Sequence, residues 1–303
     1  MKIIIAGGTG FIGSALVSQL RNKGHEIILL SRGDRTGPDN LLHYLKWDGR
    51  TLGPWADEME RADAVINLAG EPIVNKRWTP EQKRMIVNSR VDATRAIVEA
   101  MEKARRKPRV LINASAVGYY GNVPEGNVTE AHSVGEGFLA STCHQWEKES
   151  VAAEKMNVRT VLLRFGIVLE KDGGILSKMI PPFKIFAGGH PGSGRQWFSW
   201  IHRDDVVGII LFALDNSAIS GPINATAPNS VTMRDFCQEL GKVLKRPSWV
   251  PVPGFALKLM LGEMSGVLLG GQKAIPQKLL NNNYSFKFSK LEDALRSSLV
   301  KNN

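Results

Sequence analysis

MKIIIAGGTGFIGSALVSQLRNKGHEIILLSR, residues 1–32, is the stretch that decides the fold. Residues 2–6 form a β-branched run that is too short for a helix and suits a buried parallel strand. Gly7, Gly10 and Gly13 follow, and apolar residues then repeat at helical spacing until Gly24, which is placed to end the helix. Residues 26–31 are a second apolar run. This order of strand, glycine loop, helix and strand predicts the βαβ unit that binds a dinucleotide.

The glycine loop contains the residue types that phosphate binding requires. A tight turn needs glycine, and the backbone must approach a pyrophosphate closely. The helix N-terminus offers free N–H groups and the positive end of its dipole. The alternative is a plain strand-to-helix turn, but the flanking strand and helix favour a ligand site. The predicted dinucleotide-binding residues of the loop are Gly7, Thr9, Gly10, Phe11, Ile12 and Gly13.

The end of the second strand predicts which dinucleotide is bound. NAD sites usually place an acidic residue there for the ribose 2′-hydroxyl, whereas this chain has Ser31 and Arg32. An arginine can pair with a 2′-phosphate and stack on adenine. Asp34 is the nearest acid but lies beyond a glycine. The sequence therefore favours NADP over NAD, the alternative being that Arg32 is an ordinary solvated cation.

Length and composition indicate a globular α/β protein of 303 residues with 43% hydrophobic and 22% charged residues. The two cysteines, Cys143 and Cys237, give neither a disulfide framework nor metal-ligand spacing, and they fit a reducing cytoplasm. No apolar run approaches the length of a membrane helix or a signal peptide. The net charge of +10 raises nucleic acid as a partner, but much of the excess lies at residues 103–109, where cations suit a helix end. We expect no metal, nucleic acid or membrane partner.

Strands and helices alternate along the first half of the chain. Strands are predicted at 2–6, 26–31, 43–47, 64–70, 109–114 and 159–165, and helices at 54–60, 79–103 and 141–155. Thr79, Pro80 and Gln82 mark one helix start, and a long loop begins at Gly118. This alternation predicts a Rossmann-type, doubly wound parallel α/β sheet. We assign residues 1–166 to the dinucleotide domain, to which later segments can return.

After residue 166 the chain becomes rich in loops, and we assign residues 167–303 to a smaller α/β substrate lobe with a C-terminal extension from about 250. Helices are predicted at 206–214 and 232–244. The apolar stretch 255–271, FALKLMLGEMSGVLLGG, is interrupted by Lys258 and Glu263. It therefore predicts one amphipathic helix on this lobe rather than a membrane segment.

Several motifs resemble one protein family. GGTGFIG within IIIAGGTGFIGSALVSQL resembles the extended short-chain dehydrogenase/reductases, which include sugar-nucleotide epimerases and dehydratases. WIHRDD at 200–205 resembles their strand-to-helix junction, and the tail from 255 resembles an "epimerase family" branch found in bacteria and animals. The resemblance implies that Leu68, Ala69 and Gly70 close over the adenine and phosphates. It also implies a small-molecule, nucleotide-linked substrate and allows a homodimer.

Family members usually catalyse with a tyrosine, a lysine four residues later and a serine, and the lysine lowers the pKa of the tyrosine. No YxxxK occurs in this chain. On the helix expected to carry it, one alignment places Cys143 and Glu147 at the two positions, and a shift by one places His144 and Lys148 there. Histidine titrates near neutral pH, so the second alignment supplies an acid/base.

Ser115 and Tyr120 resemble the serine that orients substrate and the tyrosine of the following Tyr-Gly. The predicted catalytic residues are therefore Ser115, His144, Tyr120 and Lys148, with His144 ranked before Tyr120 as acid/base. The alternatives are a turn cap for Ser115, a pocket wall for Tyr120 and solvated positions for His144 and Lys148.

Three arginines are expected to meet anionic groups. Arg164, Arg195 and Arg203 are the cations best placed for an anionic substrate, and Arg164 is also assigned to the cofactor site. Two functions follow from the whole pattern. One is an NADP-dependent oxidoreductase or epimerase with an altered proton shuttle, acting on a sugar-nucleotide-like or small carbonyl substrate. The other is an NADP(H)-binding regulatory protein whose catalytic apparatus has decayed.

Overall fold

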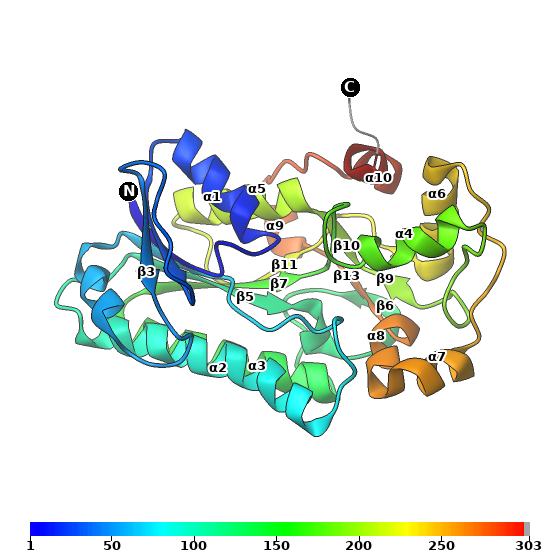
Figure 1. The fold of residues 1–303 in the computed structure, drawn as a ribbon, viewed down its shortest axis with the longest axis horizontal. Coiled ribbons are helices and arrows are strands. Elements are labelled where there is room, and N and C mark those ends of the chain that lie inside the picture. Colours follow the sequence, from blue (N-terminus) through cyan, green and yellow to red (C-terminus); the bar gives the residue numbers. More distant parts are fainter. Residues whose placement is uncertain (300–303) are drawn as a thin grey trace.

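A central sheet of seven parallel strands organises the computed structural model, which describes residues 1–299 (Figure 1). The strand order is β11-β7-β5-β4-β1-β2-β3, which reverses direction on either side of β1. The strands are β1 (Lys2–Ala6), β2 (Glu26–Ser31), β3 (Leu42–Lys46), β4 (Ala64–Asn67), β5 (Val110–Ala116), β7 (Arg159–Phe165) and β11 (Gly221–Ala225). The predicted Rossmann-type doubly wound sheet is confirmed.

Both faces of the sheet are buried, which is why its strands are continuous apolar runs. In β1, Ile3 and Ile5 belong to one hydrophobic cluster, and Ile4 and Ala6 belong to the other. Two helices cover the first face and two cover the second (Figure 1). The first pair is α1 (Gly13–Asn22) and α5 (Arg203–Asp215), and the second pair is α2 (Pro80–Lys103) and α3 (Phe138–Val151).

Helix termini largely follow the sequence signals. Thr79 caps α2 by accepting a hydrogen bond from the backbone N–H of Gln82 at 3.1 Å. The reciprocal bond to the Gln82 side chain is not formed, because the backbone N–H of Thr79 donates instead to the carbonyl of Arg77 at 2.9 Å. The residues predicted as a short helix after position 53 form a 3-10 helix, η1 (Pro54–Arg61), and α3 continues into η3 (Ala152–Met156).

The last strand of the sheet comes from far along the chain. After the loop-rich region, α5 and β11 return to the sheet, and β11 pairs with β7 in the register Ile223↔Leu163. Residues 203–225 therefore belong with the central sheet rather than with the second lobe, and the boundary at residue 166 remains a prediction.

A second lobe lies at the other end of the molecule (Figure 1). Two short sheets and several helices pack together there, and their shared core contains buried residues such as Phe183, Trp200 and Phe236. The two sheets pair β8 with β10 and β9 with β12. The elements are β8 (Ile167–Leu169), α4 (Leu176–Lys184), β9 (Trp197–Phe198), β10 (Trp200–His202), β12 (Val231–Thr232), α6 (Met233–Leu244) and α10 (Leu291–Leu299).

The C-terminal extension differs from the predicted single helix. Residues 254–269 form three short helices, because the chain turns at Gly262 with φ +60°. The elements are α7 (Gly254–Leu261), η4 (Gly262–Ser265), α8 (Gly266–Leu269), β13 (Gln272–Ala274) and α9 (Gln277–Asn281). Strand β13 pairs with β6 (Val123–Val128), so the loop predicted from Gly118 also contains η2 (Val117–Tyr120) and a strand. None of the helices within residues 1–299 combines the length and hydropathy needed to cross a bilayer.

Candidate functional site

The glycine loop between β1 and α1 has backbone geometry that other residues cannot adopt. Gly7 has φ +76°, and a Cβ there would lie 2.6 Å from the carbonyl of Leu68. A Cβ on Gly13 would lie 2.3 Å from the carbonyl oxygen of Gly7. These two glycines therefore permit a tight turn that packs directly on the end of β4.

The N-terminus of α1 is open to a ligand. No side chain caps this helix, and Thr9 and Gly10 are exposed while Phe11 and Ile12 are half-buried. Among the described residues, the first N–H groups of α1 therefore have no side-chain partner, as an anion site requires. Gly173 packs on the ring of Phe11, so a loop of the second lobe borders the glycine loop.

At the end of β2, Arg32 forms no ion pair with any acidic side chain of residues 1–299. Arg32 is exposed, and the Oγ of half-buried Ser31 accepts a hydrogen bond from the N–H of Gly33. The carboxylate of Asp34 is paired with Lys46 at 2.9 Å. The local charge around Arg32 is therefore suited to a 2′-phosphate.

The end of β4 lies beside the glycine loop. Leu68 and Ala69 are half-buried and Gly70 is exposed. The N–H of Ala69 donates to Oδ1 of Asn67 at 3.1 Å, which fixes the turn at the carboxyl edge of the sheet. This edge is where ligands bind in open α/β sheets.

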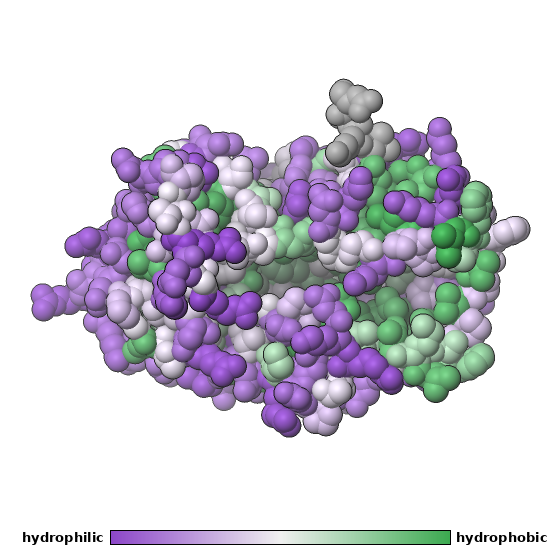
Figure 2. Space-filling model, in the orientation of Figure 1, coloured by the Kyte–Doolittle hydropathy of each residue, from purple (hydrophilic) through white to green (hydrophobic). Residues whose placement is uncertain are grey.

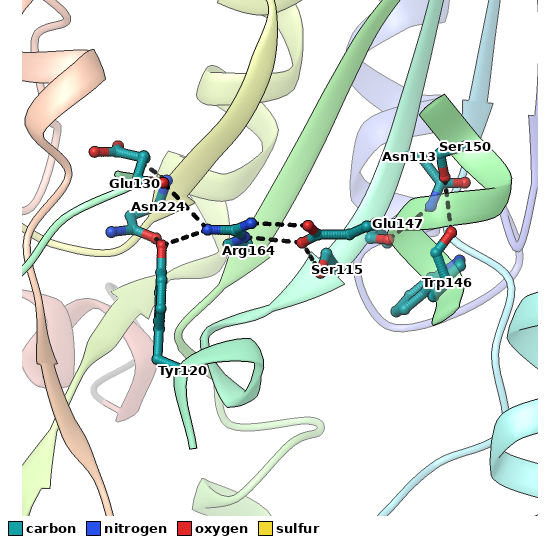
Figure 3. Close-up of polar contacts among 10 residues, drawn as sticks. Asn113, Ser115, Tyr120, Glu130, Trp146, Glu147, Ser150, Arg164 and Asn224 are labelled. Carbon is teal, nitrogen blue, oxygen red and sulfur yellow. Dashed lines mark hydrogen bonds and ion pairs between the residues drawn. The ribbon is translucent and has the colours of Figure 1, made fainter. Parts of the chain in front are cut away.

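A buried polar chain crosses the carboxyl ends of β5 and β7 (Figure 3). The guanidinium of Arg164 forms two 2.8 Å bonds to the carboxylate of Glu147, from Nε and from Nη2. Ser115 donates its hydroxyl to the same carboxylate at 2.6 Å. All three residues are more than nine-tenths buried. Glu147 already neutralises Arg164 inside the protein, which argues against the predicted role of Arg164 at the cofactor or an anionic substrate.

Tyr120 extends this chain on the other side of Arg164 (Figure 3). Its hydroxyl donates to Asn224 at 2.6 Å and accepts from Arg164 at 2.9 Å. Burial raises the pKa of Tyr120 to about 12, although the Arg164 charge opposes the shift. Tyr120 is therefore a buried structural hydroxyl that stays protonated at neutral pH, which argues against it as a base.

The two alignments of α3 differ in which face they use. Cys143 and Glu147 point towards the sheet and are buried, whereas His144 and Lys148 are exposed. The His144 ring lies 6.4 Å from the ring of Tyr119, measured between centroids. Burial raises the pKa of the Cys143 thiol to about 11, so it is not a thiolate at neutral pH. The inward-facing pair therefore supplies no cation, and its one carboxylate, Glu147, is already paired with Arg164.

Of the other two arginines, Arg203 is the first residue of α5, and Arg195 precedes β9 of the second lobe. Arg203 pairs with Glu170 at 3.0 Å and lies over the ring of Phe11, 5.5 Å from its centroid. Arg195 is exposed. Within residues 1–299 no cluster of three or more histidine, cysteine or acidic residues is arranged to hold a metal ion.

Comparison with known proteins identifies the family. The model of the NAD dependent epimerase/dehydratase family matches residues 3–225. The chain belongs to this family. A second model, described as a domain of unknown function (DUF1731), matches residues 252–298 of this epimerase family member.

Three relatives resemble the epimerase family chain over almost its whole length. A chloroplastic SDR39U1 homolog of Arabidopsis thaliana is 44% identical, over 98% of this chain and 86% of its own. Epimerase family protein YfhF of Bacillus subtilis is 44% identical, over 97% of each. The crystal structure of human epimerase family protein SDR39U1 with NADPH is 34% identical, with a TM-score of 0.87, over 98% of this chain and 99% of that one.

Three features of this epimerase family site escaped the sequence reasoning. Asn224 contacts Tyr120, and the carbonyl of Glu130 contacts Arg164. Both partners are distant in sequence, so no local sequence pattern predicts these contacts. Arg90 lies against Gly70 and the Trp146 ring at the same edge of the sheet. Its position four residues after the buried Ile86 is the one signal that could have placed it on the inner face of α2.

Proposed function

We propose that this chain binds NADP(H) in the cleft formed by the glycine loop, the ends of β2 and β4, and α3. The observation that carries the proposal is the uncapped N-terminus of α1 above glycines that permit the close turn. Asp34, the nearest acid in sequence, is paired with Lys46, so the positive charge of Arg32 is available to a ligand. This supports binding of NADP(H), which carries a 2′-phosphate, over NAD(H). The NADPH in the human SDR39U1 structure supports the same cofactor. A hollow crosses the middle of the surface in Figure 2, with hydrophobic residues in its walls.

We further propose that the protein is an oxidoreductase or epimerase of the extended short-chain dehydrogenase type, acting on a small carbonyl or nucleotide-linked compound without a tyrosine/lysine pair. NADP(H), when bound, supplies a hydride donor or acceptor. His144 is the proposed acid/base, because it is exposed on α3 whereas Tyr120 and Cys143 are buried with raised pKa values. Ser115 acts by fixing Glu147, and Lys148 adds positive charge one turn further along the helix.

A second candidate function is an NADP(H)-binding regulatory protein. The observation that favours it is the closed chain of Ser115, Glu147, Arg164 and Tyr120, in which both hydroxyls already have protein partners. In this case the cofactor changes stability or partner binding rather than undergoing hydride transfer.

Binding is tested by titrating NADPH and NADH into wild type and Gly10→Val. Gly10 is exposed above the turn, so a valine side chain should fill the pyrophosphate site and abolish binding while the fold is kept. NADPH affinity that is equal in the two proteins contradicts the proposed binding site.

Catalysis is tested by single-turnover hydride transfer in both directions, from NADPH to a panel of small carbonyl compounds and from a panel of sugar nucleotides to NADP+. Lys155→Ala is the control, because it changes a charged side chain elsewhere on the chain. Loss of turnover in His144→Ala, with turnover kept in Lys155→Ala, supports the enzymatic function. Full rate in His144→Ala removes the histidine from the mechanism. Tight NADPH binding without turnover on the whole panel supports the regulatory function.

A further inference from the structure

Aromatic and basic side chains meet on an exposed surface of the second lobe, where the end of α4 lies beside the chain that follows α6. Ile185, Phe186 and Trp249 are 75%, 55% and 69% exposed. The indole Nε1–H of Trp249 donates to the carbonyl of Phe186 at 2.8 Å, and the guanidinium of Arg246 lies 4.8 Å from the centre of the Phe186 ring. Hydrophobic residues gather at this end of the molecule in Figure 2. Exposed apolar side chains that lie together in this way mark interaction sites.

The backbone of Phe186 has a conformation that favours glycine. Its φ is +63°, and it follows Ile185, the last residue of the α4 cap. The N–H groups of Phe186 and Ala187 donate to the carbonyls of Phe183 and Pro182 at 3.0 and 2.9 Å. This is the Schellman ending of a helix, in which the left-handed residue is usually glycine. Because more than half of the Phe186 side chain is in solvent, packing offsets little of the strain, and folding alone does not account for this phenylalanine.

The same surface carries unpaired positive charge. Lys184, Lys245 and Arg246 are exposed and form no ion pair within residues 1–299. A fourth cation, Lys242, is paired with Glu239 at 3.0 Å. The acid of this region is therefore already neutralised, and the other three cations are free to meet a partner of opposite charge.

The shape of the surface and its aliphatic residues favour a protein partner. A hollow of about 510 Å³ is formed by α6 and the turn after it, lined by Gln238, Gly241, Lys242 and residues 245–248. A protein side chain can enter such a hollow, whereas a bilayer presents a broad surface. Bases of a nucleic acid stack on aromatic rings and would leave the exposed Ile185 and Val250 uncovered. A second copy of this chain, docked symmetrically through the same surface, would bring like charges together.

We propose that this surface, residues 184–187 together with 245–250, binds a protein segment in which acidic residues flank a large apolar side chain. The apolar side chain packs on Phe186 and Trp249, which the hydrogen bond between them holds in place. The carboxylates pair with Lys184, Lys245 and Arg246. Aromatic residues and arginine are the residue types that contribute most of the binding energy in protein interfaces. None of these residues belongs to the proposed NADP(H) cleft, so the proposal is independent of that function.

The test selects peptides from a random phage-displayed library on immobilised wild type. The selected peptides are synthesised with a fluorescein label and titrated into wild type, Phe186→Gly, Trp249→Ala and Arg246→Glu by fluorescence anisotropy. Arg84→Glu is the control, because it makes the same change of charge at an exposed arginine of α2. Thermal unfolding of each protein is recorded without peptide.

The selected peptides should combine aspartate or glutamate with leucine, phenylalanine or tryptophan. Their affinity should fall about tenfold or more in each of the three surface variants, as for residues at the centre of an interface, and match wild type in Arg84→Glu. Added salt should weaken binding, because exposed charges are screened. Phe186→Gly should unfold at the same temperature as wild type or higher, because glycine adopts φ +63° without strain. Lost affinity in a protein of undiminished stability separates partner contact from a role in folding.

Several results would overturn the proposal. They are the failure to select any peptide, the selection of peptides without acidic residues, and equal affinity of wild type and the three surface variants. Two further titrations use oligo(dT) and vesicles of phosphatidylcholine with phosphatidylglycerol. If no peptide is selected and one of these ligands binds wild type but not Phe186→Gly, the surface belongs to a nucleic acid or a membrane and the protein partner is excluded.

Discussion

Replacing Glu147 by glutamine should destabilise the protein far more than an equivalent change at the surface. Glu147 is 6% exposed and accepts three hydrogen bonds, two from Arg164 and one from Ser115. Glutamine has almost the same shape, but its NH2 group would face an N–H donor of Arg164. The variant therefore leaves a buried guanidinium without its counter-ion.

The magnitude follows from the burial of both partners. Removing one member of a buried ion pair costs about 3–5 kcal/mol of unfolding free energy. A chain of 303 residues, at about 2.1 cal/mol/K per residue, has an unfolding entropy of about 0.6 kcal/mol/K. The melting temperature of Glu147→Gln should therefore fall by about 5–8 °C.

Differential scanning calorimetry with Glu149→Gln as control measures this effect. Glu149 pairs with Arg95 at 2.8 Å, but their side chains are 27% and 47% exposed. Loss of this surface pair should cost less than about 1 kcal/mol, or less than about 2 °C. Equal shifts in the two variants would refute the reasoning. Glu147→Leu combined with Arg164→Met should be more stable than Glu147→Gln, because no unpaired charge remains buried.

Three further changes test other parts of the structure. Arg32→Ala should weaken NADPH binding about ten- to a hundredfold and leave NADH binding nearly unchanged, as measured by calorimetric titration; equal losses for both would contradict the 2′-phosphate contact. Burial lowers the pKa of His202 to about 4, so the folded protein holds it neutral while the unfolded chain takes up a proton below about 6.5. Stability should therefore be full above pH 6.5 and fall as the pH drops towards 4, and His202→Asn, which can still cap α5, should flatten that decline in urea unfolding curves. Both cysteines are buried and free, so a thiol reagent should modify Cys143 and Cys237 only at the rate of unfolding; rapid reaction of the native protein would show that Cys143 is open to the cleft.

Local patterns made the dinucleotide-binding half predictable. The strand, the glycines at 7, 10 and 13, and the helix after them lie within one βαβ unit, so the sequence order carries the spatial order. The cap of α2 at Thr79 is equally local. The single helix expected over 255–271 failed for the opposite reason, because apolar spacing does not reveal that Gly262 turns the chain.

The polar chain could not be predicted because its members meet only through tertiary structure. Ser115, Glu147 and Arg164 come from β5, α3 and β7, and Asn224 arrives from β11 at the sheet edge. The sequence did contain one hint, an arginine inside the apolar strand VLLRF, since a buried cation requires an acidic partner. The identity of that partner depends on which face of α3 turns inward, and the two alignments left this open.

The late arrival of β11 has a consequence for synthesis of the chain. Strand β7 ends at Phe165, but its outer neighbour is complete only at Ala225, about 60 residues later. At a translation rate of about 5–20 residues per second, the buried, apolar edge of β7 stays uncovered for about 3–12 s on the ribosome. Unpaired strand edges of this kind invite pairing with other chains. Nascent chains that pause between the two strands should therefore be the population that aggregates or engages a chaperone.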